Sequence, residues 1–241
     1  MFEITDLHNH SLFELDDGAD SRETTFAMLR ASYDSGVRSI CFTPHYFTSK
    51  NNCTPQQIAE HLACAEEYCR EYLPEMKLYA GSEVSYHYDC VDAISDGRVL
   101  TLAGSRYILL DFMGTPDARS VVKGVERLVN SGYIPVVAHI ERYAELFGRL
   151  EDVRRISDLG AVIQINAKSL LKGFMSASRR QCMKLFAEGL VDLVASDAHD
   201  LQQRPPDMKK AAELVISKFG YNYAEEVFCT VPQKILSNQR V

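Results

Sequence analysis

The chain has 241 residues, of which 46% are hydrophobic and 24% are charged, a composition typical of a globular protein with a large core. Its formal net charge of -7 at pH 7 argues against nucleic acid as a bulk electrostatic partner, because phosphate binding favours a basic face. The sequence shows no signal-peptide pattern and no apolar run long enough to cross a bilayer, so we expect no direct membrane insertion. Its seven cysteines form no Cys-x-x-Cys pair, which indicates reduced thiols and a cytoplasmic location.

The first predicted element is a short apolar strand that ends in His8 and His10. Alternate residues of an extended chain point the same way, so the two imidazoles can aim at one point. Neutral imidazole is the commonest metal ligand in proteins. An isolated His-x-His is more often a pair of solvated side chains, so this pair gains meaning only because similar strand ends recur along the chain.

A polar loop and a helix that ends at Gly36 follow, and strands and helices then alternate. Strands are expected at residues 37–43, 77–84, 107–112, 134–139, 161–166 and 191–197, and helices at 54–73, 120–130, 151–159 and 178–188, with a loop or short helix at 86–102 and a mostly helical tail from 206. Short continuous apolar strands separated by helices indicate a parallel sheet covered by helices.

About seven such units in a chain of this length predict one domain, residues 1–241, folded as a closed or nearly closed α/β barrel. A doubly wound open sheet is the alternative. No Gly-x-Gly-x-x-Gly turn follows the first strand, so a dinucleotide-binding site of the Rossmann type is disfavoured.

Most of the predicted strands end at or near a histidine, aspartate or glutamate. The set is His8, His10, Asp17, His45, Glu83, Asp111, His139, Asp197 and His199. The carboxyl ends of parallel barrel strands form the functional face, so we expect these side chains to meet there. The two other histidines, His61 and His87, are predicted to lie in a helix and a loop, and we assign them no role.

This combination of ligand types predicts a cluster of metal ions. Four carboxylates that met without cations would repel one another and stay partly protonated, and divalent cations remove that difficulty. Imidazoles and carboxylates without thiolates suit Mn, Fe, Zn or Mg. A catalytic metal typically takes about three protein ligands, so nine candidates predict two or three metals, with Glu83 or Asp197 as a bridge.

Two arginines follow candidate ligands closely. Arg142 comes three residues after His139, and Arg204 lies on the loop after His199. Guanidinium groups bind phosphate oxygens bidentately, so both are candidates for holding a phosphate, although surface ion pairing alone would also explain them. The sequence assigns no general acid, and a histidine of the cluster or a metal-bound water both stay open.

A rival motif is Cys64 with Arg70, which has the Cys-x5-Arg spacing of cysteine-based tyrosine phosphatases. That chemistry needs a loop of backbone N–H groups around the phosphate and a thiolate of lowered pKa. The stretch contains no glycine, is predicted to be helical and carries Glu66 and Glu67, which would repel phosphate. We interpret the spacing as a coincidence.

Several of these residues fall into motifs that occur together in a known family. In chain order the motifs are Asp6-x-His8-x-His10, Asp16-Asp17-Gly18, Thr43-Pro44-His45, Gly81-Ser82-Glu83, His139-Ile140-Glu141-Arg142-Tyr143, and Ser196-Asp197-Ala198-His199 with Arg204-Pro205-Pro206. Over almost its whole length the chain resembles the polymerase-and-histidinol-phosphatase (PHP) superfamily, and within it the manganese-dependent bacterial protein-tyrosine phosphatases of capsule and exopolysaccharide operons. It departs from that family at Asp111, where a glutamate is usual.

The resemblance implies a distorted TIM-like (β/α)7 barrel of the PHP type. It also implies three metals, Mn2+ foremost, on the nine candidate ligands, and a phosphate held by Arg142 and Arg204. The implied reaction is hydrolysis of phosphotyrosine monoesters by metal-activated water. The implied partner is a phosphotyrosine protein, in particular a membrane-associated tyrosine autokinase that controls capsule or exopolysaccharide synthesis.

Other functions stay open at this point. The same site could act on a small phosphate ester such as histidinol phosphate, or on a nucleic-acid end, against which the acidic balance argues mildly. A protein that only bound a kinase tail would need the ligand set to hold no metal. The oligomeric state cannot be read from the sequence.

Overall fold

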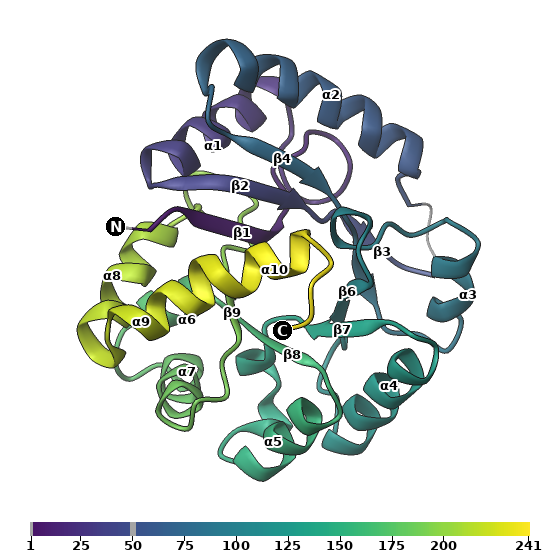
Figure 1. The fold of residues 1–241 in the computed structure, drawn as a ribbon, viewed down its shortest axis with the longest axis vertical. Helices are drawn as coiled ribbons and strands as arrows, with labels where there is room; N and C mark the ends of the chain where they lie inside the picture. Colours follow the sequence, from purple (N-terminus) through teal and green to yellow (C-terminus); the bar gives the residue numbers. More distant parts are fainter. Residues whose placement is uncertain (1, 49–51) are drawn as a thin grey trace.

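The computed structural model describes residues 2–48 and 52–241 and is drawn in Figure 1. The strands are β1 (Ile4–Asn9), β2 (Val37–Phe42), β3 (His45–Tyr46), β4 (Lys77–Ala80), β5 (Glu83–Ser85), β6 (Tyr107–Asp111), β7 (Ile134–Val137), β8 (Val162–Asn166) and β9 (Leu193–Ala195). The helices are α1 (Arg22–Asp34), α2 (Pro55–Tyr72), α3 (Cys90–Ser95), α4 (Ala118–Asn130), α5 (Leu150–Asp158), α6 (Ala167–Leu171), α7 (Ala177–Ala187), α8 (Met208–Phe219), α9 (Tyr221–Glu225) and α10 (Val231–Leu236).

The strands form two sheets in which every pair is parallel, with the orders β1-β2-β4 and β3-β5-β6-β7-β8-β9. The chain passes directly from β2 into β3 and from β4 into β5, so each of these pairs occupies one position in the sheet. Seven strand positions result, with helices around them (Figure 1). The predicted distorted (β/α)7 barrel is confirmed, and the open doubly wound sheet was the wrong alternative.

Two predicted strands are interrupted, which the sequence analysis did not anticipate. The strand expected at 37–43 ends at Phe42 and resumes at His45, because Pro44 has no N–H for the ladder. The strand expected at 77–84 breaks at Gly81, where a Cβ atom would come within 3.0 Å of the Leu102 side chain. These breaks turn His45 and Glu83 onto the second sheet, where they pair in register.

The barrel closes where the last strand position meets the first. Asn9 and Ala198 form an isolated parallel bridge. The His10 N–H donates to the Ala198 carbonyl at 2.9 Å, and the Asp197 N–H donates to the His8 carbonyl at 2.8 Å. Residues almost 190 positions apart in the sequence are thereby side by side. The closure lies at the carboxyl end of β1, where the candidate ligands are.

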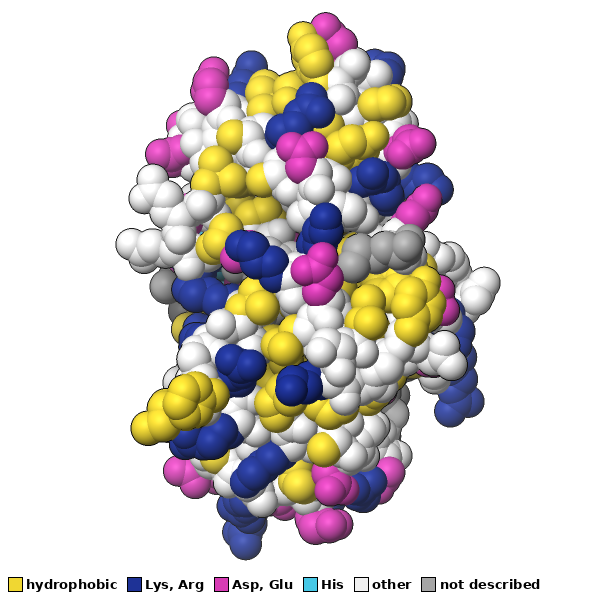
Figure 2. Space-filling model, turned by 90° about the vertical axis from the view of Figure 1, so that its left-hand side faces the viewer, with side chains coloured by type: hydrophobic (Ala, Val, Ile, Leu, Met, Phe, Trp, Pro, Cys, Tyr) yellow, Lys and Arg dark blue, Asp and Glu magenta, His cyan; other side chains and the backbone are white. Residues whose placement is uncertain are grey.

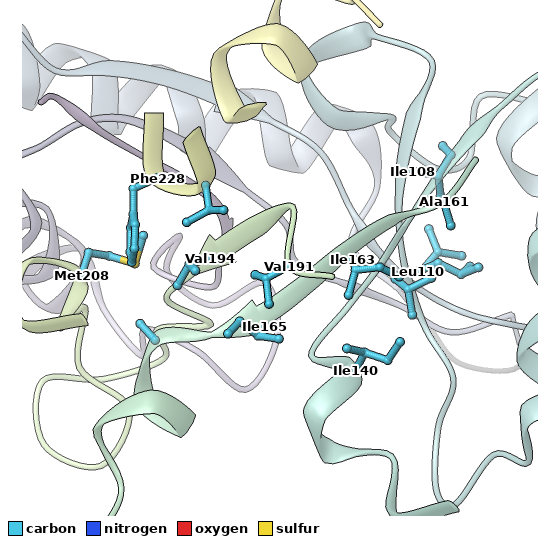
Figure 3. Packing of buried hydrophobic residues seen from close by; sticks show 14 of the residues in the cluster. Ile108, Leu110, Ile140, Ala161, Ile163, Ile165, Val191, Val194, Met208 and Phe228 are labelled. Atoms are coloured by element: carbon cyan, nitrogen blue, oxygen red, sulfur yellow. The ribbon is translucent and has the colours of Figure 1, made fainter. Parts of the chain in front are cut away.

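Alternating side chains of the strands build two apolar layers. Ile108 and Leu110 of β6 point to the cluster between sheet and helices, part of which Figure 3 shows. Tyr107 and Leu109 point to the barrel interior. Helix α10 lies across the barrel in Figure 1, and its Val231 joins this inner cluster, so the helix covers the amino-terminal end of the strands.

Helix α2 excludes a cysteine-based phosphatase site at Cys64 and Arg70. It begins after the Thr54 cap, whose side chain accepts a hydrogen bond from the Gln57 N–H, and runs unbroken to Tyr72. Cys64 and Arg70 both lie inside it. A continuous helix uses its backbone N–H groups internally and cannot wrap them around a phosphate.

Among the described residues, no helix is long and apolar enough to span a membrane.

Candidate metal centre

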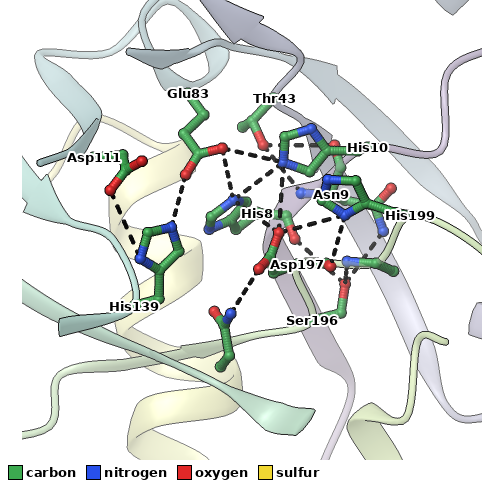
Figure 4. A network of polar contacts seen from close by, with 12 residues as sticks. His8, Asn9, His10, Thr43, Glu83, Asp111, His139, Ser196, Asp197 and His199 are labelled. Atoms are coloured by element: carbon green, nitrogen blue, oxygen red, sulfur yellow. Dashed lines mark hydrogen bonds and ion pairs between the residues drawn. The ribbon is translucent and has the colours of Figure 1, made fainter. Parts of the chain in front are cut away.

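The predicted ligands converge at the carboxyl ends of the strands, as Figure 4 shows for most of them. His8 comes from β1 and His10 from the residue after it, His45 from β3, Glu83 from β5, Asp111 from β6, His139 from just after β7, Asp197 and His199 from the segment after β9, and Asp17 from the loop after β1. His61 lies elsewhere, in α2, where its Nδ1 hydrogen-bonds the Phe13 carbonyl at 2.8 Å. His87 lies in a loop near Asp89.

Glu83 occupies the middle of the cluster and is only 1% exposed. Its Oε2 atom lies 3.3 Å from Nε2 of His8, 3.3 Å from Nε2 of His10 and 2.8 Å from Nδ1 of His45. Its Oε1 atom lies 2.9 Å from Nε2 of His139. Despite these short distances, Oε2 makes no hydrogen bond of good geometry. Such crowding is expected of ligand atoms that surround a common ion.

Three groups of ligand atoms are each close enough to share one ion. They are His10, Asp17, His45 and His199; His8, His10 and Asp197; and His8, Glu83 and His139. His8 and His10 each belong to two groups, so the groups are adjacent. The structure therefore brings together eight of the nine predicted ligands in a way that fits a polynuclear centre.

Asp111 is the ninth candidate and lies outside these groups. It lines the same cavity, but its Oδ1 atom is 3.9 Å from Nδ1 of His139. The Tyr143 hydroxyl donates to that oxygen at 3.2 Å. Burial raises the pKa of Asp111. The short side chain leaves its carboxylate at the wall of the site.

The hydrogen bonds of three histidines fix which ring nitrogen is free. His10 donates its Nδ1–H to Asp16 at 2.6 Å, and His199 donates its Nδ1–H to the Asp197 carbonyl at 3.0 Å. His8 has its Nδ1 3.2 Å from Oε1 of Gln164. In each ring Nε2 is therefore the nitrogen that faces the cluster, and it can act as a metal ligand once it carries no proton.

Gln164 and Asn166 of β8 form hydrogen bonds with residues of the cluster, and sequence reasoning missed both. Oε1 of Gln164 accepts the His139 backbone N–H at 2.8 Å, which fixes the orientation of the amide. Its Nε2 donates to Asn166 Oδ1 at 2.8 Å, and Asn166 Nδ2 donates to Asp197 at 2.7 Å. β8 supplies no candidate ligand, and its two polar residues in an otherwise apolar strand were the available signal.

Asp16 was also missed, because only its neighbour Asp17 was singled out. Besides holding His10, Asp16 accepts the backbone N–H groups of His45 and Gly18, at 3.0 and 2.9 Å. It therefore ties the loop after β1 to the start of β3. The signal was the second histidine itself, since a metal-bound imidazole usually donates its other nitrogen to a carboxylate or carbonyl.

Backbone strain marks two of the candidate ligands. His139 and Asp197 have φ angles of 33° and 52°, in the left-handed region that non-glycine residues rarely adopt. Such conformations cost about 1–3 kcal/mol each and persist where the surrounding structure holds them. Here the Gln164 bond to the His139 N–H and the β1 bond to the Asp197 N–H hold them in place.

Charges within the cluster act on one another strongly. Burial lowers the pKa of His10, but the Asp16 carboxylate overcomes this and raises it well above its usual value. In the same way Asp17 and Glu83 raise the pKa of His45 to about 9. The imidazoles in turn hold the pKa of Glu83 well below its usual value despite burial. A cation that binds here has to displace protons from these imidazoles.

The donor set fits divalent cations. Neutral imidazole nitrogens and carboxylate oxygens, with no thiolate among the groups, are the ligands of Mn, Fe, Zn and Mg. Buried Glu83 Oε2, His139 Nδ1 and His199 Nε2 have no hydrogen-bond partner, although buried polar atoms usually do. A bound cation satisfies such atoms.

The cluster forms the floor of a cavity of about 530 Å3, and both predicted arginines line it. Arg142 donates to Asp197 at 3.2 Å, and Arg204 donates to Asp17 at 3.0 Å. Each guanidinium is therefore held beside the cluster by a carboxylate of the cluster. Three apolar side chains, Leu15, Phe47 and Met113, also line the cavity.

A parallel barrel with seven strand positions and a histidine–carboxylate cluster at its strand ends defines a metal-dependent hydrolase of the PHP type. Within that class the chain belongs to the CpsB/CapC family of capsular polysaccharide synthesis proteins, whose family model matches residues 4–237. The resemblance inferred from the motifs is thereby confirmed.

Individual relatives and structures agree with this assignment. The chain is 34% identical over 243 residues to the tyrosine-protein phosphatase CpsB of Streptococcus pneumoniae, covering 99% of this chain and 100% of that protein. It is 28% identical over 220 residues to the tyrosine-protein phosphatase YwqE of Bacillus subtilis (strain 168), covering 90% and 85%. A crystal structure from work on YwqE and CpsB, described as metal-dependent tyrosine phosphatases, matches with a TM-score of 0.90 at 26% identity, covering 99% and 96%. Histidinol phosphate phosphatase from Lactococcus lactis matches with a TM-score of 0.61 at 14% identity, covering 90% and 94%, and shares the fold.

Proposed function

We propose that this chain is a metal-dependent protein-tyrosine phosphatase that hydrolyses phosphotyrosine monoesters. The observation that supports this most is the convergence of the histidine–carboxylate groups and two arginines on one cavity. Relatives that match over nearly their full length are tyrosine-protein phosphatases.

In this proposal the three groups of ligand atoms hold divalent cations, with Asp111 as an additional, more distant ligand. Bound cations would supply Lewis acidity, which neutralises charge on the phosphoryl group and lowers the pKa of water from about 15.7 towards 7. The preferred metal is Mn2+, and Fe, Zn and Mg fit the same donors.

The chain itself binds and orients the substrate. Arg142 and Arg204 hold the phosphoryl oxygens, because each guanidinium projects into the cavity with donors to spare beyond its single ion pair. Phe47 and Met113 offer apolar walls to the tyrosine ring. The leaving phenol has a pKa of about 10 and therefore needs less protonation than an alcohol would.

We also propose the setting of the reaction. The substrate is a phosphotyrosine protein, in particular a membrane-associated tyrosine autokinase of capsule or exopolysaccharide synthesis, met from the cytoplasmic side. All seven cysteines are free thiols, which fits a reducing compartment. Residues 1–241 act as one domain.

The test is hydrolysis of a phosphotyrosine peptide before and after metal stripping, followed by addition of Mn2+, Fe2+, Zn2+ or Mg2+. Activity should disappear with a chelator and return best with Mn2+, and histidinol phosphate and a nucleotide should be poor substrates. Cys64→Ser serves as the control and should keep full activity. Undiminished phosphotyrosine hydrolysis by metal-free protein would contradict the proposal.

A further inference from the structure

Large hydrophobic side chains are exposed on one part of the active face. Among the large hydrophobic side chains of the described residues, Phe174 and Met175 are the most exposed, at 78% and 75%. Tyr88 is next, and Met113 follows it at 58%. Phe147 is also exposed. They belong to the loops that follow β6, β7 and β8, which are neighbours in the sheet. In Figure 2 hydrophobic side chains project from the lower left edge next to Lys and Arg side chains. Exposed apolar groups that cluster in this way usually mark a binding surface.

Hydrogen bonds join the three loops into one surface. The Tyr143 hydroxyl accepts the Phe112 N–H at 2.9 Å, which ties the β7 loop to the β6 loop. Gln181 in the second turn of α7 accepts the Gly148 N–H at 3.1 Å and donates to the Leu146 carbonyl at 3.1 Å, which ties the β7 loop to α7.

The loop that exposes Phe174 and Met175 is itself held in shape. Arg179 donates to the Lys172 carbonyl at 2.6 Å, and Arg180 donates to the Met175 carbonyl. Two guanidinium groups of α7 are thus used to fix the loop backbone. The exposure of its two apolar side chains is therefore a built feature of this face.

Charge divides the rim of the cavity into two halves. The loops after β6, β7 and β8, with the first turns of α5 and α7, carry the basic residues Arg142, Arg149, Lys168, Lys172, Arg179 and Arg180, against the acids Asp117, Glu145, Glu151 and Asp152, the last of which pairs with Arg149. The loop after β1 carries Glu14, Asp16, Asp17 and Asp20, and the loop after β9 carries Asp200 and Asp207 together with Arg204. In a chain of net charge -7 the β6–β8 half is distinctly basic. An acidic ligand would be steered to it.

We propose that the apolar-basic strip, defined as Met113, Phe147, Phe174 and Met175 with the six basic residues around them, binds the polypeptide that flanks the phosphotyrosine. The strip selects flanks that carry acidic and large apolar side chains. It begins at the cavity wall with Met113 and continues outward along neighbouring loops. This inference rests on the proposed function, since it assigns the substrate's flanking residues to a surface.

The test uses the metal-loaded protein with the double substitution Phe174→Ser and Met175→Ser. Three substrates are compared: a phosphotyrosine peptide with Asp and Phe flanks, the same peptide with Lys and Ser flanks, and free phosphotyrosine. For the acidic peptide kcat/KM should fall about tenfold through KM, as expected when part of the burial of two apolar side chains is lost. Free phosphotyrosine should be turned over within about twofold of the unmodified rate.

Tyr72→Ser is the matched control, because Tyr72 is an exposed aromatic residue at the end of α2, before the start of β4, and so at the opposite end of the barrel. It should change none of the three rates. Lys168→Glu with Lys172→Glu should remove the preference for the acidic over the basic peptide, and added salt should weaken that preference in the unmodified protein.

Three results would overturn the proposal. One is an unchanged KM for the acidic peptide in the double variant, and another is an equal loss on free phosphotyrosine. The third is that the double substitution dissociates an oligomer, seen by sedimentation, while the KM for the peptide stays unchanged. The strip would then be an interface between copies of this chain. Fluorescence polarisation of the labelled acidic phosphopeptide measures whether the peptide binds to the strip, independently of turnover. A protein that binds the peptide through the strip yet cleaves no phosphotyrosine would contradict only the proposed function.

Discussion

At the scale of single residues, the side chains that hold the ligands matter as much as the ligands. Gln164 is fully buried and lies next to two candidate ligands, with an oxygen that accepts from the His139 N–H and lies 3.2 Å from Nδ1 of His8. It thereby fixes the ring nitrogen that His8 presents and supports the strained backbone at His139.

We predict that Gln164→Leu lowers the affinity of the protein for Mn2+ by about 10–100-fold, because both bonds disappear. Gln164→Glu keeps the accepting oxygen and should recover part of that loss. Metal binding is measured by competition with a chelator, and thermal melting of the metal-free variants checks that the fold is intact. An unchanged affinity in Gln164→Leu would show that Gln164 only fills space.

Asp111 gives the second prediction at this scale. Its carboxylate stops 3.9 Å from His139 Nδ1 and joins none of the ligand groups. Asp111→Glu adds one methylene, which extends the reach by about 1.5 Å. One metal should then bind about tenfold more tightly, whereas Asp111→Asn should bind it more weakly. Metal titration with chelator competition distinguishes these outcomes, and equal affinity in all three proteins would exclude Asp111 as a ligand.

At the scale of elements, the loop after β1 is folded tightly against the strand it leaves. The Ala19 N–H donates back to the His10 carbonyl at 3.1 Å, and Gly18 packs so closely that a Cβ atom would lie 1.9 Å from the same oxygen. This close approach brings Asp16 and Asp17 to the cluster. The glycine is needed here for space.

We predict that Gly18→Ala destabilises the protein by about 1–3 kcal/mol, because the loop backbone must move away from His10. The displacement of Asp16 and Asp17 should also weaken metal binding. Gly173→Ala is the matched control, since no atom lies within 4 Å of its would-be Cβ and its φ is not positive. Urea unfolding of both metal-free variants gives the comparison, and equal stability would contradict the prediction.

The elements also show how far the sequence could be read. Alternating apolar strands and helices sufficed to predict the barrel, and strand ends sufficed to find eight candidate ligands that lie close together. The breaks at Pro44 and Gly81 were missed because strand propensity does not report where a sheet turns a corner. Gln164, Asn166 and Asp16 were missed because their partners come from other strands, and only tertiary contacts pair them.

At the scale of the whole molecule, the end of the barrel opposite the candidate metal centre carries a half-buried acid. Burial raises the pKa of Asp192 from 3.8 to about 6, although the Ile163 N–H donates to its carboxylate at 2.8 Å. The folded protein therefore binds this proton more tightly than the unfolded chain. As pH rises from about 4 to about 6 the group loses its contribution to stability, and above pH 6 the charged form opposes folding.

We predict that Asp192→Asn stabilises the protein at pH 7–8 by roughly 2 kcal/mol and has little effect below about pH 4, where both states are protonated. Thermal melting of both proteins across pH 4–8 gives the difference. Effects of the histidine cluster cancel in this comparison, because both proteins contain it. A stability difference that does not change with pH would contradict the raised pKa.

The closure of the barrel between β1 and the segment after β9 has a consequence for biosynthesis. His8 and His10 leave the ribosome more than 180 residues before Asp197 and His199, the carboxylate and imidazole that complete their groups. A nascent chain that ends before Asp197 therefore lacks part of the candidate centre, and we expect cation binding to be complete only once that segment has been made. Translation-arrested chains that stop before Asp197 should release manganese that full-length chains retain.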